Sequence, residues 1–307
     1  MSKRLIRSIQ WRGIEIPQFV LGTVQLGLDY GISNTSGKPK NKEIFQIVED
    51  AIDHGICFFD TAQAYGDSET LLGEAFKKKS LQKQVNVISK WDPQLDPNNG
   101  EELYHSIKKS VNRLGAPLWG IMAHDETWLD LWKHIQPVID RAKEEKLIQF
   151  AGVSLYSIEA AKTAINNPKI DFIQMPFNAW DQRFLTKEIQ QLAIQKNTLC
   201  FIRSIFLQGL LLMSPDDVKK KMNNAFQLSN EWNKVSYELN KSRKELAFDI
   251  AHTIQCPLVI GVDNKNQLRQ NIKLFDRKTL SLKDCENIRK KIAPFLYPQI
   301  TNPSEWN

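Results

Sequence analysis

The residues best suited to chemistry lie where a short apolar run ends. The run 56–59 is followed directly by Asp60, and Tyr65 comes next in a loop that also contains Gly66. A short, continuous apolar run is typical of a strand buried on both faces of a parallel sheet. Side chains that handle ligands collect at the carboxyl ends of such strands. Asp60 and Tyr65 are therefore candidate site residues, and Ser68 is predicted to cap the helix that follows.

Two further polar side chains occupy equivalent places. Lys90 ends the apolar run 85–90, and His124 ends the run 119–124. A phenol has a pKa near 10, so it acts as a general acid at neutral pH only beside a cation that stabilises its phenolate. Lys90 would supply that cation, Asp60 would keep Lys90 charged, and His124 would orient a carbonyl or assist proton transfer. Hydride would come from a nicotinamide, because no side chain donates it. The structural alternative is a buried Asp60–Lys90 ion pair beside a core histidine.

Eight apolar runs alternate with helical patterns along the chain. The repeated strand-helix order predicts parallel strands with right-handed crossovers, which close into a (β/α)8 TIM barrel. A doubly wound open sheet is the alternative. We expect one barrel domain over residues 1–307, with an N-terminal β-hairpin at residues 4–17 and a C-terminal helix and tail. The predicted strands are Phe19 to Gly22, Ile56 to Asp60, Val85 to Lys90, Trp119 to His124, Ile148 to Ser154, Phe172 to Gln174, Leu199 to Arg203 and Leu258 to Gly261.

Three segments depart from the simple repeat. The connection 204–240 is much longer than a usual strand-to-helix loop and begins at a strand end, which favours a lid or nucleotide clamp. The tail from Pro294 to Trp306 is expected to pack on the outside of the barrel, with coverage of the barrel mouth as the alternative. Pro137 is expected to break or kink a helix over 129–142.

Composition narrows the function classes. The 307 residues are 42% hydrophobic and 25% charged, with a formal net charge of +6. These are the values of a soluble globular protein. No apolar run approaches the roughly 20 residues of a membrane span, and the first residues lack a secretory pattern, so we expect a cytoplasmic protein without membrane contact. The dispersed basic residues predict no nucleic-acid partner, and the Cys and His spacings predict no metal site. A monomer or small homo-oligomer is expected.

The sequence resembles the aldo-keto reductase family over nearly its whole length. The stretch Asp60-Thr-Ala-Gln-Ala-Tyr65-Gly is similar to the family signature Asp-Thr-Ala-x-x-Tyr-Gly. The resemblance implies a (β/α)8 barrel that uses NADP(H), or in some members NAD(H). It also places Asp60, Tyr65, Lys90 and His124 on the four catalytic positions of the family. Tyr65 would be the general acid and base, Lys90 and Asp60 would tune it, and His124 would orient the substrate.

The resemblance implies a cofactor site as well. Ser154 matches a serine that holds the nicotinamide carboxamide, whereas Leu155 stands where the family has asparagine. Arg203 stands where the family often stacks an aromatic ring on the nicotinamide, and its charge should favour the reduced cofactor. Ser204 and the loop after it would bind the pyrophosphate. The predicted cofactor-binding residues are Gly22, Thr23, Ser154, Gln174, Arg203, Ser204, Leu207, Gly261, Lys265, Gln267 and Asn271.

The adenosine part of this site determines the choice of nucleotide. Gln267 occupies the position where many members have an arginine for the 2′-phosphate, and Lys265 or Arg269 is expected to replace that arginine. We therefore expect NADP(H) in preference to NAD(H).

The expected reaction is the reduction of an aldehyde or ketone to an alcohol. Segment 29–34 should shape the substrate pocket, and Asp29, Asp125 and Arg203 favour a hydroxylated or anionic carbonyl, such as a sugar derivative. The altered positions Leu155 and Arg203 leave open a nucleotide-binding sensor or interaction subunit with little turnover. A Schiff base on Lys90 is a third interpretation, against which the neighbouring acid argues because it should keep the amine protonated.

Overall fold

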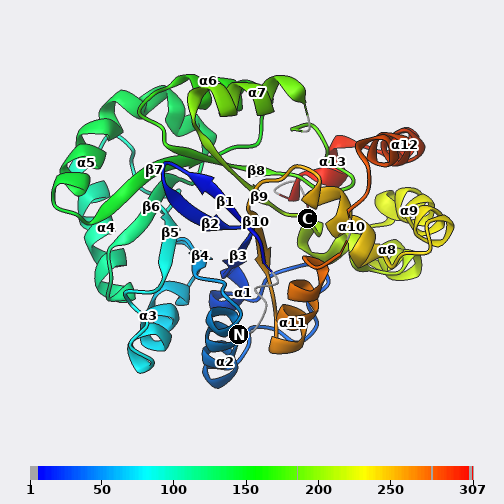
Figure 1. The fold of residues 1–307 in the computed structure, drawn as a ribbon, viewed down its shortest axis with the longest axis horizontal. Helices are drawn as coiled ribbons and strands as arrows, with labels where there is room; N and C mark the ends of the chain where they lie inside the picture. Colours follow the sequence, from blue (N-terminus) through cyan, green and yellow to red (C-terminus); the bar gives the residue numbers. More distant parts are fainter. Residues whose placement is uncertain (1–5, 185, 278, 304–305, 307) are drawn as a thin grey trace.

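The eight apolar runs form the strands of a closed barrel. The computed structural model describes residues 6–184, 186–277, 279–303 and 306. Neighbouring barrel strands pair in parallel, and β10 pairs with both β3 and β9, so the sheet closes on itself (Figure 1). The predicted TIM barrel is thus confirmed, and the open doubly wound sheet is wrong. The strands are β3 (Phe19–Gly22), β4 (Phe58–Asp60), β5 (Asn86–Lys90), β6 (Leu118–Ala123), β7 (Ile148–Ser154), β8 (Phe172–Pro176), β9 (Leu199–Arg203) and β10 (Leu258–Gly261).

Amphipathic helices alternate with these strands and surround them (Figure 1). Helix α4 illustrates why they form: Leu103, Ile107 and Leu114 share one buried face, and the Asn99 side chain caps the first turn by accepting from the Glu102 N–H at 3.2 Å. The helices of the barrel are α1 (Val24–Gly27), α2 (Asn41–Asp53), α3 (Ser68–Lys78), α4 (Gly100–Leu114), α5 (Trp132–Glu144), α6 (Ile158–Asn166), α7 (Lys187–Lys196), α10 (Arg243–His252) and α11 (Lys265–Leu274).

An N-terminal hairpin seals one end of the barrel. Strands β1 (Ser8–Trp11) and β2 (Ile14–Pro17) pair antiparallel and lie across the barrel in Figure 1. Trp11 packs edge-on against Phe150, with ring centroids 4.9 Å apart, and against Trp119 at 6.0 Å. The hairpin therefore closes an apolar interior, and the polar strand ends lie at the opposite mouth.

The helix after β6 differs from its prediction. Residues Glu126–Leu131 form a 3₁₀ turn, η1, and α5 begins only at Trp132. The helix then continues through Pro137 to Glu144, so the proline does not break it. A proline removes one backbone hydrogen bond, and the buried side chains Ile135, Val138 and Ile139 keep this helix packed on the barrel.

The long connection after β9 and the C-terminal tail take separate places. The connection begins at the barrel mouth and then folds as helices beside the barrel (Figure 1). In the tail, Ile300 is fully buried, and Phe295, Leu296 and Trp306 pack against the main core, as expected. These parts comprise η2 (Leu207–Leu212), α8 (Pro215–Lys221), η3 (Asn223–Ala225), α9 (Phe226–Glu238), α12 (Leu282–Ile292), η4 (Ala293–Phe295) and α13 (Pro298–Thr301). No helix within the described residues is both long and apolar enough to cross a membrane.

Candidate active site

A cavity of about 470 Å³ opens at the carboxyl ends of the barrel strands. All four predicted catalytic side chains line it, and so do ten of the eleven predicted cofactor residues. Lys265 is the exception, and none of the described tail residues reaches the cavity. The predicted residues on the lining are Gly22, Thr23, Asp60, Tyr65, Lys90, His124, Ser154, Gln174, Arg203, Ser204, Leu207, Gly261, Gln267 and Asn271.

A buried ion pair forms the floor of this cavity. The Nζ of Lys90 donates to Asp60 Oδ1 at 2.6 Å and to the carbonyl oxygen of Thr61 at 2.9 Å. The second carboxylate oxygen of Asp60 accepts from Gln174 Nε2 at 2.7 Å. Both charged side chains are almost completely buried. Because each carboxylate oxygen has a donor, the pair is fixed in position, as a buried pair must be to offset its desolvation.

The phenol and the imidazole lie above this pair. Lys90 Nζ is 5.0 Å from the centroid of the Tyr65 ring, and the Tyr65 and His124 rings meet edge to face at 5.9 Å. Burial, with the Asp60 charge, raises the pKa of Tyr65 above its ordinary value, while Arg203 opposes this shift. Burial lowers the pKa of Lys90 against the opposing effect of Asp60. Burial also lowers the pKa of His124 to about 3, so this imidazole is neutral at physiological pH.

Close backbone packing positions the Tyr65 loop. A Cβ on Gly27 would lie 1.8 Å from the Tyr65 carbonyl oxygen, so only glycine fits there. Ser68 is the first residue of α3 and does not cap it, contrary to the prediction. Its hydroxyl instead donates to Thr23, at 2.9 Å from Thr23 Oγ1, and accepts from Thr61 Oγ1 at 3.0 Å. This buried serine therefore joins the loops after β3 and β4.

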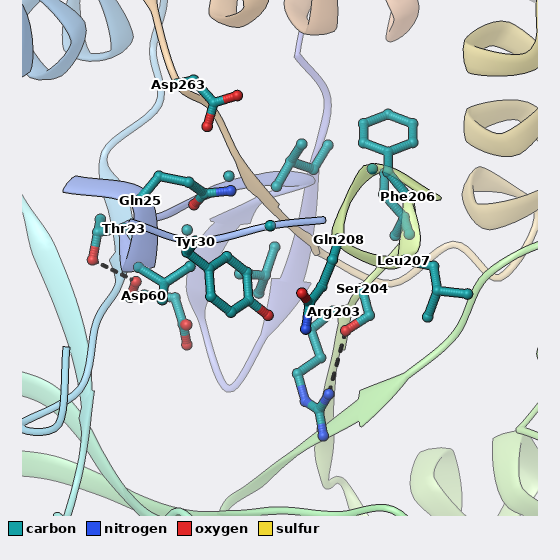
Figure 2. Close-up of a pocket in the computed structure, with 18 of the residues that line it drawn as sticks. Thr23, Gln25, Tyr30, Asp60, Arg203, Ser204, Phe206, Leu207, Gln208 and Asp263 are labelled. Atoms are coloured by element: carbon teal, nitrogen blue, oxygen red, sulfur yellow. Dashed lines mark hydrogen bonds between the residues drawn. The ribbon is translucent and has the colours of Figure 1, made fainter. Parts of the chain in front are cut away.

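The loops after β3 and β9 meet across the cavity. Figure 2 shows the ring of Tyr30 and the side chain of Gln208 pointing toward each other, and their hydrogen bond partly offsets the burial that raises the pKa of Tyr30 to about 12. The Ser33 hydroxyl also donates to the Gln208 carbonyl oxygen at 3.4 Å. Residues Ser204, Leu207 and Gln208 all have positive φ, a conformation that non-glycine residues adopt only when their surroundings hold them there.

The other end of the cavity is built on the start of α11. Gln267 binds Asp263 twice, accepting from its N–H at 2.9 Å and donating to its Oδ2 at 3.1 Å. Lys265 lies 3.4 Å from Asp50 Oδ1, and Arg269 binds both oxygens of Asp50 at 2.9 Å. Both basic residues predicted to hold a 2′-phosphate are therefore paired with an acid on α2.

Lys244 of α10 is a third cation at this end, and it lines the cavity. Its Nζ donates to Gln270 Oε1 at 3.1 Å, and no ion pair joins it to a carboxylate in the described part of the chain. Burial lowers the pKa of Lys244.

The lining matches the polar groups of a nicotinamide dinucleotide. Gln174 Oε1 and Asn271 Oδ1 are buried acceptors without a partner in the described structure, and both residues line the cavity. A buried acceptor without a donor is costly, so each oxygen is suited to receive an N–H from a ligand. The nicotinamide carboxamide and the adenine amine offer such donors. Gln174 lies beside the ion pair and Asn271 on α11, as binding of the two ends would require.

Several lining residues were not predicted from sequence. Tyr156 follows β7 closely, and Gln25 follows β3, so a stricter search of strand ends would have found them. Gln208 lies in the loop after Ser204 that was expected to bind the pyrophosphate, although it was not singled out, and no pattern in the sequence indicated Lys244. Conversely, Asp29 and Asp125, which were expected near the substrate, do not line the cavity: Asp29 accepts from Asn34 Nδ2 at 3.2 Å and Asp125 caps η1.

Known proteins share this fold and sequence pattern. An oxidoreductase of Bacillus subtilis, YqkF, which is described as uncharacterized, is 24% identical over 90% of this chain and 97% of its own. The aldo-keto reductase AKR11C1 of Bacillus halodurans superposes with a TM-score of 0.74 over 97% of this chain and 100% of its own, at 18% identity. The glycerol dehydrogenase AKR11B4 of Gluconobacter oxydans superposes with a TM-score of 0.72 over 96% of this chain and 97% of its own, at 20% identity. The sequence model of the Aldo/keto reductase family matches residues 18–293. The chain is therefore an oxidoreductase that belongs to the aldo/keto reductase family.

Proposed function

We propose that the protein reduces an aldehyde or ketone to an alcohol with NAD(P)H, and that Tyr65 is the general acid. The observation that carries this proposal is the convergence of Tyr65, His124 and the Lys90–Asp60 pair in one cavity. Proton donation by a positioned side chain contributes about 10²- to 10⁴-fold to a rate. The raised pKa of Tyr65 keeps the phenol protonated until a carbonyl oxygen accepts its proton.

Each of the four side chains Asp60, Tyr65, Lys90 and His124 has a distinct role in this proposal. The bound reduced nicotinamide supplies the hydride. Tyr65 gives its proton to the carbonyl oxygen, and the Lys90 ammonium stabilises the phenolate that remains. Asp60 keeps Lys90 charged and in place. His124, neutral because of its lowered pKa, hydrogen-bonds the carbonyl and sets its orientation.

Residues of this chain would hold the cofactor along the cavity. Ser154 and the free oxygen of Gln174 would bind the carboxamide, and Asn271 would bind the adenine. The loop that begins at Ser204 would surround the pyrophosphate. For the preference for NADP(H) over NAD(H), the supporting feature is Lys244, because it lines the cavity without a carboxylate partner, whereas Lys265 is bound to Asp50. The Asp263 carboxylate opposes this preference, although Gln267 already binds it.

The substrate is a small carbonyl compound that carries polar groups, as a sugar derivative does. Support comes from the loops that meet over the cavity, which present the polar side chains of Tyr30 and Gln208 to it. Hydroxyl groups of a substrate would satisfy such donors and acceptors. The similar structure from Gluconobacter oxydans is described as a glycerol dehydrogenase, which is consistent with a polar substrate.

Mixing the purified protein with NADPH or NADH and a panel of sugars, small aldehydes and ketones tests this function. We expect oxidation of the nucleotide to depend on the carbonyl, with NADPH used more efficiently than NADH. Tight nucleotide binding without turnover on any carbonyl class would favour the sensor interpretation. Borohydride trapping of a carbonyl on Lys90 would favour the Schiff base, although Lys90 already donates to Asp60 and to Thr61.

A further inference from the structure

The end of the cavity lined by Tyr65, Lys90 and His124, called the reactive end below, carries one positive charge that no carboxylate of the described residues balances. Lys90 and Asp60 neutralise each other at 2.6 Å, and His124 is neutral. Arg203, at the end of β9, lines the same space. Among the described residues, none of the carboxylates forms an ion pair with its guanidinium. This charge is therefore available to an anionic ligand that enters the cavity.

The guanidinium also has unused donors. Its Nη1 donates to Ser204 Oγ at 3.3 Å, and its Nη2 donates to the carbonyl oxygen of Leu155 at 3.4 Å. Both contacts are long and both acceptors are neutral. Arginine has five N–H donors in a planar fork that fits a carboxylate or phosphate with two parallel hydrogen bonds. Most of its hydrogen-bonding capacity thus remains for a ligand.

A neighbouring aromatic ring holds the planar guanidinium group of Arg203 in place. The guanidinium carbon of Arg203 lies 4.3 Å from the centroid of the Tyr156 ring. Stacking on an aromatic face orients a guanidinium and leaves its N–H edges free. Less side-chain entropy is then lost when an anion binds.

Arg203 lies at the end of the cavity where the reaction would occur. Its charge acts on Tyr65, where it opposes the rise in pKa, and on His124, where it contributes to the lowered pKa. Figure 2 shows its guanidinium at one end of the pocket and Asp263 at the other. A substrate whose carbonyl oxygen meets Tyr65 would therefore place a neighbouring substituent beside this arginine.

We propose that Arg203, stacked on Tyr156, binds an oxyanion group of the substrate, a carboxylate or a phosphate, so that the protein prefers anionic carbonyl compounds to neutral ones. This inference rests on the proposed reductase function. In the reaction, hydride from the reduced nicotinamide forms the new C–H bond and the Tyr65 proton forms the O–H bond. The carbonyl becomes an alcohol, the nicotinamide is oxidised, and the oxyanion group is unchanged.

Matched substrate pairs test this preference. Phenylglyoxylate is compared with methyl phenylglyoxylate, and glyceraldehyde phosphate with glyceraldehyde, each with saturating NADPH. For at least one pair we expect kcat/KM to favour the anionic member by about 10- to 100-fold, the effect of a charge-assisted bidentate contact. In Arg203→Met this ratio should fall close to one. Arg203→Lys, which keeps the charge and loses the fork, should give an intermediate ratio.

Arg289 provides the control for net charge, because it lies on α12 outside the cavity and pairs with Glu286. Arg289→Met should keep the wild-type ratio. If the wild-type protein uses the neutral members equally well, or if Arg203→Met and Arg203→Lys keep the preference, the inference is wrong.

A binding measurement separates this inference from the reductase function. Calorimetry with the NADPH complex should show mandelate binding at least about tenfold more tightly than methyl mandelate, with the difference lost in Arg203→Met. Mandelate binding without turnover of any carbonyl would contradict the reductase function and leave the oxyanion site standing. Turnover of neutral carbonyls with no such difference in binding would contradict the oxyanion site and leave the reductase function standing.

Discussion

The two ends of the cavity are built by different parts of the fold. At the reactive end, Asp60 and Lys90 occupy the last positions of β4 and β5, and two short hydrogen bonds connect them to each other and to Gln174. At the other end, where we propose that the adenosine binds and which is called the adenosine end below, the polar groups come from helices α10 and α11 and the turn before α11. A strand end in a closed barrel points to the mouth by topology, whereas a helix residue faces the cavity only if its rotation and its partners allow it.

The largest expected difference between the two ends concerns the buried ion pair. Lys90→Met leaves the Asp60 carboxylate buried with only Gln174 as a partner, which should cost about 3–5 kcal/mol of unfolding free energy. Carbonyl reduction should also fall by about 10³-fold. Urea unfolding and steady-state kinetics measure both effects.

The double variant Asp60→Asn/Lys90→Met is the matched control, since it removes both charges. It should regain most of the stability and none of the activity. If Lys90→Met alone is as stable as the wild type, the ion pair is not buried as described.

Acidification should weaken the reactive end through His124. Its pKa is about 3 in the folded protein and about 6.5 when unfolded, so the unfolded chain binds the proton more tightly. The contribution of His124 to the free energy of unfolding is complete above the pKa of the unfolded state and is lost as the pH falls toward the pKa of the folded state. Between pH 7 and pH 5 the free energy of unfolding should fall by about 2 kcal/mol because of this group. Unfolding curves at both pH values should show a correspondingly smaller loss for His124→Asn, and equal losses would refute the burial of a neutral imidazole.

A smaller effect is expected at the adenosine end. Lys244→Met should weaken NADPH binding by about tenfold, the strength of one charge-assisted contact, and change NADH binding by less than about twofold. Fluorescence titration of both nucleotides measures this directly. Equal losses for both nucleotides, or none, would remove Lys244 as the residue that recognises the 2′-phosphate.

The smallest effect is expected for Lys265→Met. This side chain is 41% exposed and lies in the group around Asp50, where Arg269 supplies the stronger pairing. Nucleotide affinity should change by less than about twofold, and stability by at most about 1 kcal/mol. A large loss of NADPH affinity would instead restore the role that the sequence suggested for Lys265.

The sequence predicted the barrel and the reactive end well for one reason. The eight apolar runs are separated by amphipathic helices, and the catalytic candidates directly follow such runs, so topology alone brings Asp60, Lys90 and His124 to one mouth. The catalytic roles themselves stay predictions. The hydroxyl network of Ser68 could not be foreseen, because a serine near a helix start usually caps it.

The adenosine end was less predictable because its contacts are long-range. From the sequence, Lys265 or Arg269 was predicted to hold the 2′-phosphate of a nucleotide. In the structure, Asp50, far away in the sequence on α2, binds both. Lys244 comes from another helix, and nothing in its own segment indicates a ligand. Such pairings depend on how helices pack side by side, which a single sequence does not specify.

Hydride transfer in Tyr65→Phe tests the central claim most directly. Wild type and variant are loaded with NADPH, mixed with saturating carbonyl substrate, and followed through one turnover by nicotinamide absorbance. We predict that the variant binds NADPH as tightly as the wild type, because the phenol is not among the groups proposed to hold the cofactor, and that its transfer rate is about 10²- to 10⁴-fold lower. A variant that transfers hydride at the wild-type rate would show that Tyr65 is not the proton donor.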